Sequence, residues 1–114
     1  MNIAISNTAE ITVVKLAGDI DTTTATGVQE KVLPLAAPGS KILLDMTDVA
    51  YMSSAGLRLL LSLYRHVSAQ SGKVVLVGLA AEIKDTMEVT GFLSFFTTCD
   101  TVDLGIAALE SASK

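Results

Sequence analysis

The chain has 114 residues, enough for one compact domain; half of its residues are apolar, 18% are charged, and its net charge is −4. That balance excludes a disordered chain, which combines low hydrophobicity with high net charge, and it speaks against a nucleic-acid-binding surface, which needs clustered lysine and arginine. The single cysteine, Cys99, excludes an internal disulfide, and the single histidine, His66, excludes a histidine-rich zinc site.

The sequence contains no recognisable targeting or membrane segment. Its first residues lack the basic start and the apolar run of a signal peptide. Apolar stretches such as residues 74–81 are far shorter than the roughly 20 residues that a spanning helix needs. We therefore expect a cytoplasmic protein with one domain over residues 1–110 and a short tail at residues 111–114.

The first part of the chain predicts a β-hairpin followed by a helix. Ile3 and Ile5 alternate with small or polar neighbours, and residues 11–16 form a run rich in β-branched side chains, as is typical of two antiparallel strands joined by a polar turn. Gly18 ends the second strand, and Asp21 or Thr22 is placed to cap a helix. The apolar positions of this helix recur at helical spacing: Ala25, Val28 and Val32.

The middle of the chain predicts two buried strands with a long helix between them. Residues 41–45 and 73–77 are continuous apolar runs with charged residues only at their ends, which suits strands buried on both faces of a parallel sheet flanked by helices. Residues 54–71 predict an amphipathic helix that ends at Gly72. Its predicted inward stripe consists of Leu57, Leu60, Leu61, Tyr64 and Val67.

The last part predicts a helix over residues 81–90 that ends at Gly91, a short strand over residues 93–98, and a final helix capped by Asp100 or Thr101. The complete order is therefore strand, strand, helix, strand, helix, strand, helix, strand, helix. Strands that alternate with helices indicate an α/β fold. We expect a mostly parallel sheet with an antiparallel first strand, packed with helices.

The segment that says most about function is residues 45–57, which read Asp-Met-Thr-Asp-Val-Ala-Tyr-Met-Ser-Ser-Ala-Gly-Leu. It combines a buried strand, a polar loop and small hydroxyl residues at the start of a helix. The unpaired N–H groups there favour anions. A serine at this point is either a plain N-cap, which is the commoner case, or a site placed to carry phosphate.

This segment resembles the signature of the STAS-domain anti-sigma factor antagonists: an apolar strand, Asp, a short loop, then an apolar residue and Asp-Ser-Ser/Thr-Gly-Leu at a helix start. The alignment places Ser53 at the pattern's Asp, Ser54 at its phosphoacceptor serine and Ala55 at its second hydroxyl. Residues 18–21, Gly-Asp-Ile-Asp, resemble a second family motif, and residues 83–92 resemble the family's third helix. The resemblance covers nearly the whole chain.

The resemblance implies a partner switch in bacterial transcription regulation. The unphosphorylated protein would bind an anti-sigma factor, itself a serine kinase, and free a sigma factor. Phosphorylation of Ser54, with Ser53 as the alternative acceptor, would end binding, and a serine phosphatase of the partner-switching type would restore it. The implied partner-binding residues are Asp19, Ile20, Asp21, Ser53, Ser54, Ala55, Gly56 and Arg58. No catalytic residue, cofactor, metal, nucleic acid or membrane insertion is implied.

Two residues of the motif differ from the family pattern. Ser53 replaces an acidic residue that could orient a kinase, and Ala55 removes the second hydroxyl.

We expect a side chain at Gly56 to stand over the phosphoacceptor and block the partner. Asp19 and Asp21 are either partner contacts or parts of a helix start with an Asp cap.

Three other functions stay open on the sequence alone. The chain could be a separate STAS subunit or binding module associated with a lipid or anion transporter. It could also be a STAS module that senses a nucleotide at the same helix N-terminus. An enzyme is the weakest of the three, because the chain offers so few acid–base and metal-binding groups.

Overall fold

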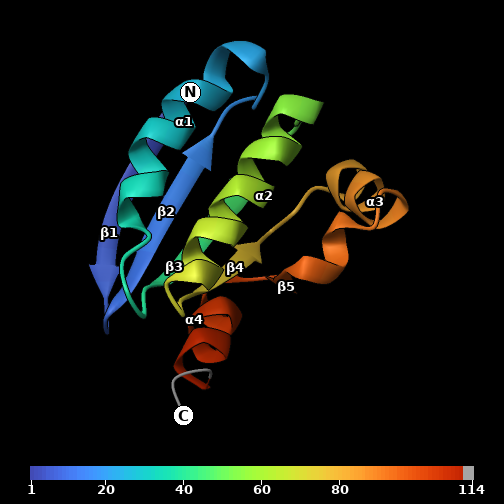
Figure 1. The fold of residues 1–114 in the computed structure, drawn as a ribbon. Coiled ribbons are helices and arrows are strands. Elements are labelled where there is room, and N and C mark those ends of the chain that lie inside the picture. The colour runs from blue at the N-terminus through green and yellow to red at the C-terminus, as the bar shows by residue number, and fades with distance from the viewer. Residues whose placement is uncertain (112–114) are drawn as a thin grey trace.

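The computed structural model describes residues 1–111 and contains the helices and strands in the predicted order (Figure 1). Within that range, one mixed sheet has the strand order β1-β2-β3-β4-β5. Strand β1 is antiparallel to β2, and the other neighbouring pairs are parallel, which confirms the predicted α/β fold. The strands are β1 (Asn2–Thr8), β2 (Ile11–Ala17), β3 (Lys41–Asp48), β4 (Lys73–Val77) and β5 (Thr97–Cys99).

The helices divide between the two faces of this sheet. Because parallel crossovers are right-handed, a sheet whose strands follow sequence order carries its crossover helices on one face. Helices α1 and α2 lie side by side on that face, and α4 packs on the other (Figure 1). The helices are α1 (Thr22–Val32), α2 (Ser54–Ala69), α3 (Ala81–Val89) and α4 (Val102–Ser111), with short 3₁₀ turns η1 (Leu33–Leu35) and η2 (Phe92–Phe95).

The central strands are buried on both faces. Among the described residues, a larger apolar core lies between the sheet and α1, α2 and α3, and a smaller one lies beneath α4. Leu44 belongs to the larger core and its neighbour Leu43 to the smaller one, because successive side chains of a strand point to opposite faces. Burial on both sides explains why these strands read as unbroken apolar runs.

Helix α2 differs from its prediction in which side chains it buries. Leu59 and Leu63 are buried although the predicted stripe left them out, whereas Leu61 and Tyr64 are half-buried. The helix also ends at Ala69 rather than at residue 71. A 16-residue helix that lies flat on a sheet buries a wider face than a narrow stripe of positions predicts.

The left-handed residue that ends α2 is Ser71, whereas the sequence predicted that Gly72 would end the helix. Ser71 takes the left-handed conformation, with φ of 59°, and its N–H donates to the carbonyl of Ser68. The N–H of Gly72 donates to the carbonyl of Val67, which completes a Schellman motif. Gly72 is needed for space instead, because a Cβ there would lie 2.6 Å from the carbonyl oxygen of Ser40.

The strand predicted over residues 93–98 is wrong in its first half, where the chain forms η2 before β5. The rings of Phe95 and Phe96 both contact the ring of Tyr64 on α2, each with centroids 5.5 Å apart. A strand would send these neighbours to opposite faces, so the chain turns instead.

The C-terminal helix begins as predicted from one of its two candidate caps. The hydroxyl of Thr101 accepts from the N–H of Leu104 at 3.2 Å. Of the predicted tail, Ser111 belongs to α4, and residues 112–114 lie outside the described residues. Over residues 1–111, the helices all fall short of the length and apolar character that a membrane crossing requires.

Candidate functional site

The two sequence motifs meet where β2 and β3 end. The N–H of Gly18 donates to the carbonyl of Asp48 at 3.1 Å. Farther along, the N–H of Ile20 donates to the carbonyl of Tyr51 at 3.0 Å, and the N–H of Ser53 donates to the carbonyl of Ile20 at 2.8 Å. These bonds tie the loop before α1 to the loop before α2, so residues 18–21 and 49–53 form one connected surface.

The two adjacent serines have different environments. Ser53 is the N-cap of α2: its Oγ accepts from the N–H of Ala55 at 3.2 Å, and its side chain is half-buried. Ser54 is the first residue of the helix and is exposed, and across residues 1–111 its hydroxyl has no hydrogen-bond partner. The sequence left open whether the motif serine is a cap or an acceptor, and the structure gives the cap to Ser53.

The start of α2 is electrostatically suited to an added anion. The first turn of the helix contains no acidic residue, so the partial positive charge of its N–H groups is not neutralised there. Arg58 is exposed and lies four residues after Ser54, one turn along the same side of the helix. A negative group on Ser54 would therefore lie at the positive end of the helix, one turn before a cationic side chain.

The two aspartates of the neighbouring loop differ in their contacts. Asp21 caps α1, where its Oδ1 accepts from the hydroxyl of Thr23 at 2.7 Å and from the N–H groups of Thr23 and Thr24 at 2.9 and 3.2 Å. The hydroxyl and N–H of Thr23, followed by the contacts from Thr24, lower the pKa of the Asp21 carboxyl from its ordinary value of 3.8. The hydroxyl of Thr24 completes a capping box by accepting from the N–H of Asp21. The side chain of Asp19 is exposed.

Gly56 does not face the phosphoacceptor, contrary to the expectation from the sequence. It is buried, and a Cβ there would lie 3.0 Å from Cγ2 of Ile20 and would overlap the side chain of Met52. Ile20 itself is fully buried. The missing side chain at Gly56 therefore lets Ile20 and Met52 pack closely against α2, and neither Gly56 nor Ile20 is open to a partner.

The remaining residues of the expected surface can be ordered by exposure. Asp19, Ser54 and Arg58 are exposed, whereas Asp21, Ser53 and Ala55 are half-buried. The solvent-facing part is thus an acidic residue on one loop, with a hydroxyl and a cation on the neighbouring helix.

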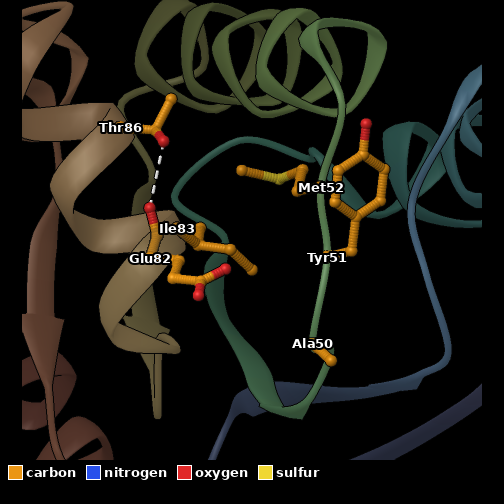
Figure 2. Close-up of a pocket in the computed structure, with 6 residues that line it drawn as sticks. All are labelled: Ala50, Tyr51, Met52, Glu82, Ile83 and Thr86. Atoms are coloured by element: carbon orange, nitrogen blue, oxygen red, sulfur yellow. Dashed lines mark hydrogen bonds between the residues drawn. The ribbon is translucent and has the colours of Figure 1, made fainter.

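A small pocket that the sequence did not reveal lies beside this surface. It measures about 120 Å³ and lies between the loop before α2 and helix α3, with Met52 extending toward α3 (Figure 2). Tyr51 borders it and is 54% exposed. The sequence feature that could have indicated this pocket is the large aromatic residue directly before Met-Ser-Ser. The pocket is lined by Ala50, Tyr51, Met52, Glu82, Ile83 and Thr86.

The site offers no metal centre within residues 1–111, because no three His, Cys, Asp or Glu side chains there lie close enough together to hold an ion. Cys99 is half-buried in β5, and His66 is exposed on α2, where its Nδ1 lies 2.7 Å from the carbonyl oxygen of Ser62. Neither residue belongs to the surface around Ser54.

Comparison with known proteins agrees with the motifs and the fold. The STAS domain family model matches residues 2–105. The chain is 33% identical over 78 residues to the anti-sigma-B factor antagonist of Bacillus subtilis, which covers 68% of this chain and 72% of that protein. The chain therefore belongs to the STAS domain family, among the anti-sigma factor antagonists.

Solved structures share the same architecture. An anti-sigma factor antagonist from Mycobacterium paratuberculosis superposes with a TM-score of 0.83 at 20% identity, over 96% of this chain and 93% of that one. The phosphorylated form of the Bacillus cell fate determinant SpoIIAA superposes with a TM-score of 0.72 at 19% identity, over 94% and 98% of the two chains. At these identities the likeness shows the fold.

Proposed function

We propose that this protein is an anti-sigma factor antagonist whose partner binding is switched off by phosphorylation of Ser54. In the unphosphorylated state it binds an anti-sigma factor with serine kinase activity, and the sigma factor is freed. The kinase then transfers the terminal phosphoryl group of ATP to Oγ of Ser54 and releases ADP. A serine phosphatase hydrolyses the ester. The chain itself acts in the cytoplasm as a ligand and kinase substrate without catalysis of its own.

The observation that carries this proposal is the division of tasks between the two serines. Ser53 holds the helix N-terminus through its hydroxyl, while the hydroxyl of Ser54 is exposed and makes no bond within the described part of the chain. A kinase can reach Ser54 without undoing the cap. Modification of Ser53 would remove a hydrogen bond that the helix start uses.

Phosphate on Ser54 is expected to leave the fold intact and act on the partner. A helix N-terminus stabilises a nearby anion by about 0.3–2 kcal/mol, and Arg58 adds a cation one turn away. The helix therefore gains rather than loses from the modification. The added bulk and about 1.5–2 negative charges instead enter an interface that already contains the exposed carboxylate of Asp19.

The pocket beside the site supports a protein partner more than a nucleotide. Sites for small molecules usually enclose about 300–1,000 Å³, whereas this one measures about 120 Å³. That space suits one side chain of a partner. With Tyr51 exposed at its border, the pocket extends the docking surface from Ser54 toward α3.

The proposal is tested with a candidate anti-sigma kinase encoded in the same genome and radiolabelled ATP. Wild type and Ser53→Ala should be labelled, whereas Ser54→Ala should not be labelled while keeping its affinity for the kinase. Trypsin cuts after Lys41 and Arg58, so both serines fall in residues 42–58, and fragmentation of that peptide assigns the phosphate.

Two results would count against this scheme. Label that persists on Ser54→Ala at wild-type stoichiometry would move the acceptor to another residue. Equal affinity of the kinase for phosphorylated and unphosphorylated protein would show that phosphorylation does not switch the binding.

A further inference from the structure

The two outer edges of the sheet differ in how well they are protected against pairing. Strand β5 has three residues, and very short edge strands resist addition of another strand. Strand β1 has seven residues, contains no charged residue and no proline, and pairs with β2 in unbroken register. Six of its residues are exposed. Charge, proline and bulges are the usual protections of an edge, and β1 has none of them.

The hairpin turn determines which backbone groups of β1 point away from the sheet. Ala9 and Glu10 have φ of 49° and 67°, the two positive values that define a type I′ turn. The flanking residues Thr8 and Ile11 therefore exchange both of their backbone hydrogen bonds. Bonded and non-bonded pairs alternate along an antiparallel ladder. Counting back from Thr8, the residues whose N–H and C=O point outward are Asn7, Ile5 and Ile3.

We propose that this edge pairs with the β1 edge of a second copy of the chain, antiparallel, about a two-fold axis at Ile5. In that register Ile5 faces Ile5 of the second copy, and Ile3 faces its Asn7. Every outward N–H and C=O of those three residues then finds a partner. A shift of two residues in either direction would leave Ile3 or Asn7 without one, so the strand specifies its own register.

The side chains on this edge suit the same arrangement. Ile5 is paired with Val14 of β2 and is 42% exposed on the face that carries α1. The two-fold would place the Ile5 side chains of both copies against each other and remove apolar surface from water. Because β1 carries no charge, no like charges oppose one another across the axis.

The pairing is separate from the proposed partner switch. In an antiparallel arrangement the parallel strands of the two copies run in opposite directions, so the two Ser54 loops lie at opposite ends of the extended sheet. Both loops stay accessible. One strand pair buries less surface than a permanent dimer interface, so we expect weak association that depends on concentration.

The test is sedimentation velocity of the 114-residue chain between about 10 μM and about 1 mM. Wild type should shift toward dimer over this range. Ile5→Lys and Ile5→Glu each place like charges on the axis and should each weaken association about fivefold or more, while an equal mixture of the two should restore it. Recovery in the mixture also shows that both variants fold. Val89→Lys, at a position that is 87% exposed on α3, is the matched control and should behave as wild type.

Two results would overturn the proposal: a wild type that stays monomeric throughout, or dimers that form equally well from Ile5→Lys and Ile5→Glu. The register is tested by oxidative cross-linking in a Cys99→Ser background. Bonded antiparallel pairs have Cα atoms about 5.5 Å apart, within the range of a disulfide. Ile5→Cys should cross-link with itself. Ile3→Cys should cross-link with Asn7→Cys and not with itself, and the reverse pattern would refute the axis.

Discussion

A methyl group added at Gly56 tests the packing beneath the two loops. The energy of Gly56→Ala has two opposing parts. Alanine is favoured over glycine in a helix by about 0.8–1 kcal/mol. Against this, the new Cβ would overlap the side chain of Met52 and lie 3.0 Å from Cγ2 of Ile20. Overpacking in a well-filled core costs about 1–3 kcal/mol. We expect a net destabilisation of about 0–2 kcal/mol.

The chain contains a matched control for this substitution. Gly27 lies within α1, and among the described residues nothing stands within 4 Å of the Cβ it would carry. Gly27→Ala should therefore show the helix gain alone and stabilise the fold by up to about 1 kcal/mol. Urea unfolding followed by circular dichroism measures both free energies. We expect Gly56→Ala to be less stable than Gly27→Ala by about 1–3 kcal/mol.

A second substitution isolates the clash itself. Met52→Ala removes the side chain atoms that the new methyl group overlaps, so the cost of Gly56→Ala should fall in that background. If Gly56→Ala stabilises the protein as much as Gly27→Ala does, the close packing of Met52 and Ile20 on α2 is refuted.

Three further predictions concern the caps and the modified serine. Ser53→Ala should lower the free energy of unfolding by about 0.5–2 kcal/mol because it removes the α2 cap. Ser54→Ala should change that free energy by less than about 0.5 kcal/mol. Equal losses for the two variants in urea unfolding would contradict the assignment of the cap to Ser53. The depressed pKa of Asp21 means that its carboxylate stabilises the fold above about pH 4 and loses that contribution as the pH falls through the folded-state pKa. The stability gap between wild type and Asp21→Asn should accordingly narrow in acid, and a constant gap would contradict the argument. Phosphorylation of Ser54 should leave the far-ultraviolet circular dichroism unchanged, and Arg58→Gln should destabilise the phosphorylated form more than the unmodified form, by about 0.2–0.5 kcal/mol at low salt; loss of helix signal on phosphorylation would refute the proposed action on the partner.

The elements that the sequence predicted best are those whose patterns record burial directly. Residues 41–45 and 73–77 lack alternation because they pack against two cores, and that pattern alone indicated parallel strands between helices. Residues 93–98 were harder, since Phe95 and Phe96 favour strands by propensity. Their turn depends on Tyr64, a contact across about 30 residues of sequence that no local pattern contains.

The site was predictable to the level of the loops and no further. The motifs located Ser53 and Ser54, but a pattern cannot place a helix start to within one residue, and one residue decides which serine is the cap. The direction of Gly56 depends on how Ile20 and Met52 fold beneath the loops. Tyr51 was missed because its pocket exists only once α3 is placed opposite the loop.

The backbone bonds between Ile20 and the loop of Tyr51 and Ser53 have a consequence for protein engineering. A partner meets a single composite surface, in which the residues on one loop are held in position by the other. Grafting one loop from a relative would pair a new contact segment with a host neighbour that was not selected to support it. Residues 18–21 and 49–58 should therefore be exchanged together when partner preference is to be transferred between members of the family.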